Sequence, residues 1–295
     1  MRITENQIAS SFLSSINYTQ GRITDLQSQL ATGKRVLKVS DDPQATERIL
    51  RLNTQLQRND TFQKNIDDAV STLDTTASAL NDFSNVLIKV KDIAIQTRNG
   101  SRLDAYPALA QQIDQFIDEA LNTANTKFNG KYIFGGVQTT NQPYTIDAGR
   151  TTVSTNAAGI TGTIAYPVGE GFSLQVNVDG QQAFQGTQIF NQLIQLRDAL
   201  KAGTAPTNAQ MDALDAAMDN VLGAASKAGA LQTNCENIKT QLQEQQQKLR
   251  ALLSDQQDVD VAQSAVDLKK NQTMLEAALS TGANILPKTL LDYLR

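Results

Sequence analysis

The residues of this 295-residue chain that could do chemistry are few, and the missing residue types are the most informative. The chain contains no histidine and one cysteine, Cys235. Without histidine it lacks the commonest general base and metal ligand, and a single cysteine can form neither an internal disulfide nor a paired-cysteine metal or redox motif. We therefore expect no catalytic residue, no metal site and no cofactor. Catalysis by carboxylates or lysine is the least favoured alternative.

The pair Asp41-Asp42 is the acidic motif that most resembles a metal or acid–base site. Pro43 follows it directly. Proline is favoured at the first position of a helix, and an aspartate before it accepts hydrogen bonds from the first free backbone N–H groups. We therefore interpret Asp42 and Pro43 as a helix cap. Cys235 lies on a helical stripe, and we interpret it as a small buried residue.

Composition excludes several classes of protein. The net charge is −4, and no basic cluster is present to bind a phosphate backbone, so we expect no nucleic-acid partner. No run of about 18 apolar residues could cross a membrane, so we expect no membrane insertion. The first residues lack the apolar core and cleavage site of a secretory signal peptide, which alone would indicate a cytoplasmic protein.

The elements that must position these residues fall into three compositional parts. Segment 130–186 holds 10 of the 17 glycines and only five charged residues, and its Thr, Val, Ile and aromatic residues alternate with turn residues. This pattern predicts short antiparallel strands, with a hairpin turn at Asp179-Gly180. The middle of the chain is therefore expected to be a small β domain inserted between helices.

Both flanking parts have helical periodicity. Segment 45–97 contains neither proline nor glycine, and apolar residues recur in it every three or four positions. Further helices are expected at 107–127 and 189–200, and Thr207–Gln210 has the form of a capping box that opens a long helix. A helix of about 53 residues would be about 80 Å long, too long for a compact globule of this chain.

The predicted fold is mainly α with a small β insert: an elongated antiparallel bundle of long helices, or coiled coil, formed by both halves of the chain. We expect three domains. They are a terminal coiled-coil domain of residues 1–42 with 255–295, a helical rod domain of residues 43–129 with 187–254, and the β domain of residues 130–186.

Both ends of the chain carry one thin apolar stripe on a Gln/Ser/Thr/Asn surface. Apolar residues recur every seven positions, and such helices need partners along the stripe. We therefore expect the two ends to lie together. The stripes define a candidate assembly interface of Phe12, Ile16, Ile23, Leu26, Leu30, Leu37, Val261, Leu268, Leu275, Leu279, Leu286 and Leu290.

Four motifs, taken together with their order along the chain, resemble those of the flagellin superfamily of bacterial axial proteins. Near the N-terminus, Leu30-Ala-Thr-Gly-Lys-Arg35 precedes Ser40-Asp-Asp-Pro-Gln-Ala45, and near the C-terminus Asp258-Val-Asp-Val-Ala262 precedes the last helix. The remaining two motifs, Asn129-Gly-Lys-Tyr-Ile-Phe-Gly-Gly136 and Ile285-Leu-Pro-Lys-Thr-Leu-Leu-Asp-Tyr-Leu-Arg295, are similar to the family members that join hook and filament. The resemblance covers about residues 1–136 and 205–295.

The resemblance implies a non-enzymatic structural subunit of the flagellum. It implies export through the flagellar type III apparatus without cleavage, with a chaperone holding the C-terminal segment before export. The implied partners outside the cell are hook-associated protein 1, flagellin and further copies of the chain in a ring at the hook–filament junction.

We expect both ends to be disordered in the free monomer and to fold on assembly, because the thin stripes bury little apolar area against the entropy of ordering the backbone. An ordinary intramolecular core is the alternative interpretation of the stripes. Two other functions also stay open. The chain could be the filament flagellin itself, or an unrelated secreted coiled-coil adhesin or effector whose β insert binds a host ligand.

Overall fold

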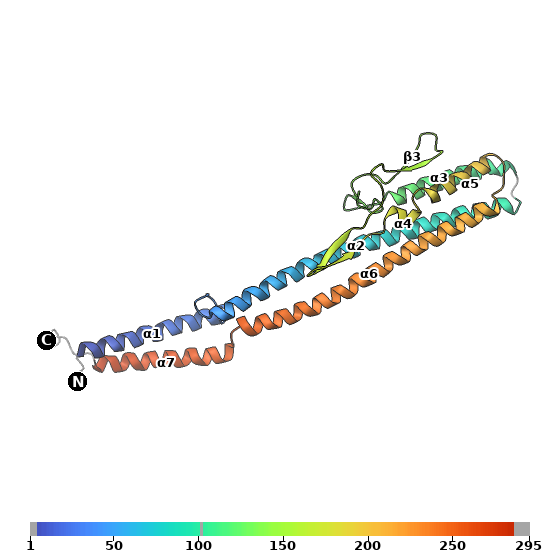
Figure 1. Cartoon of the computed structure of the whole chain (residues 1–295). Helices are drawn as coiled ribbons and strands as arrows, with labels where there is room; N and C mark the ends of the chain where they lie inside the picture. Colours follow the sequence, from blue (N-terminus) through green and yellow to red (C-terminus); the bar gives the residue numbers. More distant parts are fainter. Residues whose placement is uncertain (1–4, 101–102, 286–295) are drawn as a thin grey trace. The chain divides into compact units, whose positions relative to one another are not determined.

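The structure, a computed structural model, describes residues 5–100 and 103–285 and is mainly helical (Figure 1). The predicted fold class, mainly α with a small β insert, is confirmed. The helices are α1 (Glu5–Thr32), α2 (Pro43–Arg98), the 3₁₀ turn η1 (Leu103–Ala105), α3 (Tyr106–Ala124), α4 (Gly180–Phe184), α5 (Gln188–Lys201), α6 (Asn208–Gln257) and α7 (Val261–Ile285).

The β insert consists of three antiparallel pairs of short strands. Strand β1 (Lys127–Phe128) pairs with β2 (Lys131–Tyr132), β3 (Tyr144–Ile146) with β4 (Val153–Thr155), and β5 (Ala165–Gly169) with β6 (Phe172–Gln175). The turn between β1 and β2 is formed by Asn129 and Gly130, both with positive φ, as a two-residue hairpin loop of this twist requires.

Local signals set the ends of the long helices. Helix α2 begins at the predicted proline, and Gly100 follows its end with φ 98°, a conformation that glycine adopts without strain. The capping box at the start of α6 forms as predicted. Gln210 Oε1 accepts a hydrogen bond from the N–H of Thr207 at 2.9 Å, and Thr207 Oγ1 accepts one from the N–H of Gln210 at 3.3 Å.

The described chain divides into two compact units. Unit 1 comprises residues 1–58 and 245–295, as far as they are described, and unit 2 is the continuous segment 59–244. The boundaries fall within α2 and α6. The three-domain division made from the sequence stays a prediction.

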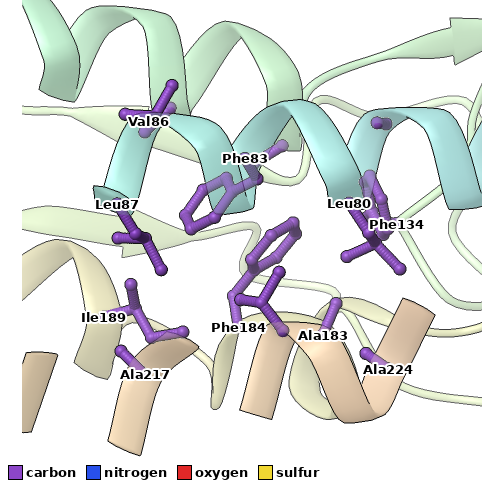
Figure 2. Close-up of a cluster of buried hydrophobic side chains, with 14 of the residues drawn as sticks. Leu80, Phe83, Val86, Leu87, Phe134, Ala183, Phe184, Ile189, Ala217 and Ala224 are labelled. Atoms are coloured by element: carbon purple, nitrogen blue, oxygen red, sulfur yellow. The ribbon is translucent and has the colours of Figure 1, made fainter. Parts of the chain in front are cut away.

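Unit 2 has a large core in which α2, α3, α5, α6 and the β insert meet. Its centre is an aromatic cluster around Phe184, whose ring centroid lies 4.6 Å from that of Phe83 and 4.8 Å from that of Phe134 (Figure 2). The rings of Tyr144 and Phe190 lie 5.7 Å and 5.8 Å from it. Burial raises the pKa of Tyr144, so its hydroxyl stays protonated. That hydroxyl donates a hydrogen bond to Gly180 O at 3.0 Å.

The hairpin turn predicted at Asp179-Gly180 is wrong. Asp179 is the N-cap of α4, and its Oδ1 accepts a hydrogen bond from the N–H of Gln182 at 2.8 Å. Its Oδ2 accepts a second bond, from the N–H of Gly162, at 3.1 Å. An Asp-Gly pair suits a tight turn and a helix start equally well, and here the buried Phe184 favours the helix because it places the ring in the core.

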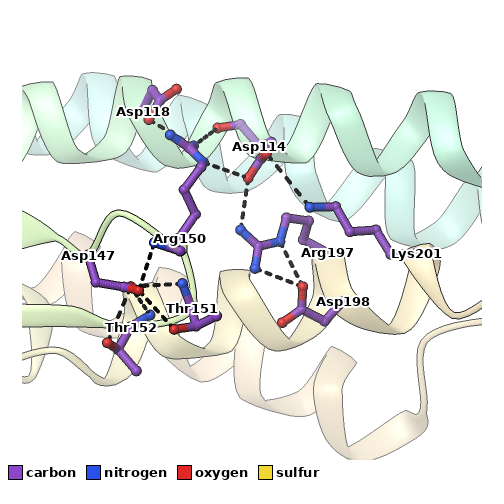
Figure 3. Close-up of polar contacts among 10 residues, drawn as sticks. Asp114, Asp118, Asp147, Arg150, Thr151, Thr152, Arg197, Asp198 and Lys201 are labelled. Carbon is purple, nitrogen blue, oxygen red and sulfur yellow. Dashed lines mark hydrogen bonds and ion pairs between the residues drawn. The ribbon is translucent and has the colours of Figure 1, made fainter.

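A network of ion pairs joins the β3–β4 loop to α3 and α5 (Figure 3). Asp114 is at its centre, 2.9 Å from Arg197 Nη1 and 3.3 Å from Arg150 Nε. The side chain of Arg197 is only 2% exposed, and Asp198 contacts it at 2.7 Å from the other side. Partial burial of Asp114 raises the pKa of its carboxyl, but the hydrogen bond from Arg197 and the charge of Arg150 outweigh that effect and hold the pKa below its usual value.

Replacing Asp114→Asn is expected to lower the free energy of unfolding of unit 2 by about 2 kcal/mol, because the buried Arg197 loses a charge-assisted partner. Urea unfolding at neutral pH measures this change. The control is Glu119→Gln on the same helix, since Glu119 pairs only with Lys89 at the surface and should change stability by less than about 0.5 kcal/mol. Equal effects of the two variants would contradict a special role of Asp114.

The stability difference between the wild type and Asp114→Asn should also depend on pH. Because folding lowers the pKa of Asp114, the stabilisation is present above the unfolded value of 3.8 and is lost as pH falls through the folded value. The difference between the two proteins should therefore begin to shrink as pH falls below 3.8 and vanish below the folded pKa of Asp114. A difference that persists unchanged at pH 2 would contradict the ion-pair explanation.

Candidate functional site

The candidate assembly interface lies in unit 1, where α1 and α7 pack side by side and antiparallel (Figure 1). The pair buries very little. Among the described apolar side chains of the two helices, only Ile23 and Leu26 are buried, and on α7 the buried side chain is the polar Ser264. A helix pair with so small a core is marginal by itself, since most helical stability in proteins comes from tertiary packing.

The predicted interface residues occupy three environments. Ile23 and Leu26 are buried between the helices, and Phe12, Ile16, Leu30, Leu268 and Leu275 are half-buried. Leu37, Val261 and Leu279 are exposed; Leu37 follows the end of α1, and Val261 is the first residue of α7. Leu286 and Leu290 lie outside the described residues.

Sequence reasoning missed a second set of apolar residues on these helices. Val266 and Met274 on α7 are 63% and 53% exposed, and Leu13 and Tyr18 on α1 are also exposed. They lie off the heptad stripe, so the only signal for them was a large apolar residue on a surface that is otherwise polar. Counted with Val261 and Leu279, they give the helix pair uncovered apolar side chains beyond the seam between its two helices.

At its inner end the helix pair is joined by a clasp, which we define as residues 33–35 together with 256–259. The N–H of Arg35 donates to Gln257 O at 2.7 Å, and the N–H of Val259 donates to Gly33 O at 3.0 Å. Gly33 has φ 70°, a conformation that favours glycine. The clasp therefore brings together two of the sequence motifs, Leu30–Arg35 and Asp258–Ala262, which are more than 200 positions apart.

The side chain of Arg35 adds charge to the clasp. Its Nη2 donates to Gln256 O at 3.1 Å, in the last turn of α6, where the helix dipole favours a cation. Its Nη1 lies 3.3 Å from Asp42 Oδ2, at the start of α2. Arg35 thus connects the end of one long helix to the beginning of the other.

Aspartates cap both helices that begin beside the clasp. Asp42 Oδ1 accepts a hydrogen bond from the N–H of Ala45 at 2.9 Å, which lowers the pKa of Asp42, and Pro43 is the first residue of α2. Asp260 Oδ1 accepts one from the N–H of Gln263 at 3.0 Å, near the start of α7. Asp42 and Asp260 therefore fix where α2 and α7 begin, and so fix the inner end of the helix pair.

A small apolar cluster supports the clasp. Val36, Ala45 and Ile49 are buried together, and Leu253 of α6 packs against them. Unit 1 is therefore held together mainly around the start of α2 and the end of α6, and much less along α1 and α7.

Groups of side chains that could hold a metal ion, reactive cysteines and membrane spans were each sought among the described residues. Across 5–100 and 103–285 no group of three or more acidic or cysteine side chains could hold a metal ion. Cys235 is buried in the core of unit 2, and burial raises the pKa of its thiol. Within that part of the chain no helix combines the length and apolarity that a membrane span requires.

Comparison with family models gives two matches. The model of the bacterial flagellin N-terminal helical region matches residues 3–139, and that of the C-terminal helical region matches residues 211–294. Together they cover most of the chain and include both helices of the terminal pair and both halves of the clasp.

The chain is similar in sequence to flagellar proteins and similar in fold to a solved structure. The chain is 24% identical to the flagellin of Bacillus subtilis over 100% of both sequences. It is also 24% identical to flagellar hook-associated protein 3 of Escherichia coli, over 94% of this chain and 95% of the relative. The fold is similar to that of a Legionella pneumophila flagellar hook-associated protein 3, with TM-score 0.63, 17% identity and coverage of 70% and 98% of the two chains.

Proposed function

Because this chain belongs to the bacterial flagellin family, we propose that it is a structural subunit of the flagellum that forms the junction between hook and filament. Its neighbours in the axial structure are hook-associated protein 1, flagellin and further copies of itself in a ring. The role is mechanical and needs no catalysis. The closing motif at 285–295 supports the junction over other positions in the axis, and the similarity to hook-associated protein 3 over 95% of that protein's length is consistent with it.

The main support for this proposal is that the terminal helix pair is held by hydrogen bonds at its inner end but buries very few apolar side chains between its two helices. The clasp and the caps at Asp42 and Asp260 orient α1 and α7, yet only Ile23 and Leu26 are buried along them. Large apolar side chains such as Val266 and Met274 are left in solvent. Helices of this kind gain stability when neighbouring copies cover them, at about 1.5–3 kcal/mol for each apolar side chain fully buried.

We propose that the interface with neighbouring subunits uses the stripe residues of both terminal helices together with Val266 and Met274. In the free monomer these helices are disordered. They become ordered on assembly because each incoming copy buries part of the apolar surface of the copy that was added before it. This makes assembly cooperative and keeps the unassembled chain in a state suited to export.

We also propose that the protein acts outside the cell. It is exported through the flagellar type III apparatus, and a chaperone of this protein class holds the C-terminal segment until export. A marginal terminal helix pair suits this route, since little free energy is needed to keep it open.

Reconstitution on purified hooks tests the function. Hooks from a strain that lacks this protein but retains hook-associated protein 1 are incubated with it and then with flagellin monomers, and filament growth is followed by electron microscopy. We expect filaments only where the protein was added, and flagellin monomers in the medium of the deletion strain. Equal filament growth on hooks without the protein would refute the junction role.

Substituting Arg35→Ala tests whether the clasp positions the interface. We expect at least a tenfold loss of incorporation at hook ends, because the end of α6 and the start of α2 lose their shared cationic partner. The matched control is Arg51→Ala on α2, where the arginine pairs only with the exposed Glu47 one helical turn away. Incorporation of both variants at the same level would argue against the clasp.

The similarity to the flagellin of Bacillus subtilis over the whole of both chains favours a second candidate, the filament subunit itself. Immunogold labelling of intact flagella separates the two functions. A label confined to one short zone next to the hook supports the junction subunit, whereas a label along the whole filament supports flagellin.

A further inference from the structure

The outer end of the terminal helix pair contains a close contact between a glycine and an aromatic ring. Gly282 lies on α7 against Phe12 of α1. A Cβ atom added at Gly282 would fall within 3.0 Å of the ring atoms Cε1 and Cζ of Phe12, a separation that real Cβ atoms essentially never show, so the ring of Phe12 would have to move. The glycine is buried, and the ring of Phe12 occupies the space that a side chain would take.

The backbone gives no reason for a glycine at position 282. Gly282 is absent from the residues with positive φ, and α7 continues past it to Ile285. Glycine in a helix is less favourable than alanine, so the residue weakens the helix it belongs to. What it supplies is room for Phe12.

The other glycines inside the long helices are different. Cβ atoms added at Gly21 on α1, or at Gly223 and Gly229 on α6, would meet nothing within 4 Å. Within α7, Gly282 is the only glycine, and within α1, Phe12 is the only phenylalanine. The largest side chain of the α1 stripe therefore faces the one position of α7 that has no side chain.

Two anchor points fix how the helices lie against one another. At the inner end, the clasp holds Gly33 beside Val259, and at the outer end, Phe12 sits on Gly282. Sliding α7 by one helical turn would bring Ala278 or Leu279 level with Phe12, and each has a side chain where the ring now lies. The thin apolar seam between the anchors is too uniform to exclude such a slip by itself.

We propose that Phe12 and Gly282 form a register notch that selects a single antiparallel alignment of α1 and α7. This inference rests on the proposed assembly function, because the alignment determines where the exposed Val266 and Met274 stand relative to Leu13 and Tyr18, and so which surface a neighbouring copy meets. Gly282 is a positioning residue that acts through Phe12.

Substituting Gly282→Ala tests the notch. Alanine is the better helix former, so weaker assembly would have to come from the clash with Phe12 and not from a weaker helix. We expect incorporation at hook ends to fall at least tenfold. The matched control, Gly21→Ala, adds the same methyl group to a helical glycine of the same pair with open space around it, and it should stay within twofold of the wild type.

A compensating change separates a specific clash from a general defect. Exchanging the two residues, Phe12→Gly with Gly282→Phe, again places one ring opposite a glycine at the same level, and incorporation should rise at least threefold above that of Gly282→Ala. A Gly282→Ala variant that assembles normally, or an exchange that assembles no better than Gly282→Ala, would overturn the notch while wild-type activity leaves the junction function standing. Failure of the wild-type protein in the same assay would refute the function instead.

Discussion

A fragment of residues 59–244 is expected to fold cooperatively by itself and to lose all ability to join hook ends. This segment is continuous and contains the whole of the large core, from Ile66 on α2 to Leu242 on α6. It lacks both terminal helices and the clasp. Thermal unfolding followed by circular dichroism and the hook-binding assay measure the two properties on the same sample.

The full-length chain is the control for the fragment. Because the fragment keeps the core, its melting temperature should lie within a few degrees of that of the full chain. Two results would contradict the claim that unit 2 supplies the stability and unit 1 the assembly interface. They are a fragment that is unfolded when isolated, and a fragment that still binds hooks and seeds flagellin.

Replacing Phe184→Ala is expected to lower the free energy of unfolding of unit 2 by about 3–5 kcal/mol. Phe184 is fully buried, and its ring meets those of Phe83, Phe134, Tyr144 and Phe190, which come from three different parts of the fold. Truncation leaves a cavity where the β insert, α2 and α5 converge. Urea unfolding of the 59–244 fragment gives the value directly.

Phe172→Ala provides the comparison for Phe184→Ala. Phe172 belongs to the same insert, on β6, but is 52% exposed, so its truncation should cost less than about 1 kcal/mol. If the two substitutions had the same effect, the aromatic cluster would not be the centre of the core.

Much of the fold could be predicted from the sequence because its signals are local. Helix α2 is bounded by Asp42-Pro43 on one side and Asn99-Gly100 on the other, with nothing between them that would break a helix. The capping box at Thr207 marks the start of α6 in the same way. Wherever a cap or a breaker acts on its own neighbours, the sequence pattern was sufficient.

Features that depend on distant partners were not predictable. The Asp179-Gly180 pair was assigned to a hairpin because its turn chemistry is ambiguous until the buried position of Phe184 is known. The clasp needs the backbone of Gly33 and Arg35 to meet that of Gln257 and Val259 across the fold. Nothing in the sequence around Gly33 or around Val259 indicates that the two segments lie side by side.

The candidate interface was predictable in outline only. Heptad spacing identified Ile23 and Leu26 on α1, which are buried. It could not distinguish them from Leu279 on α7, which has the same spacing but is exposed. Nor could spacing indicate that Gly282 faces Phe12, because glycine gives no signal in a search for apolar stripes. Shape complementarity between two helices became visible only in three dimensions.

Hydrogen exchange of the dilute monomer, compared with the same protein assembled on hooks, tests the central claim most directly. We expect the amides of α1 and α7 to exchange within seconds in the monomer, while those of the unit 2 core stay protected. On assembly, the terminal helices should become protected at least a hundredfold. Strong protection of α1 and α7 in the dilute monomer, unchanged by assembly, would contradict that claim.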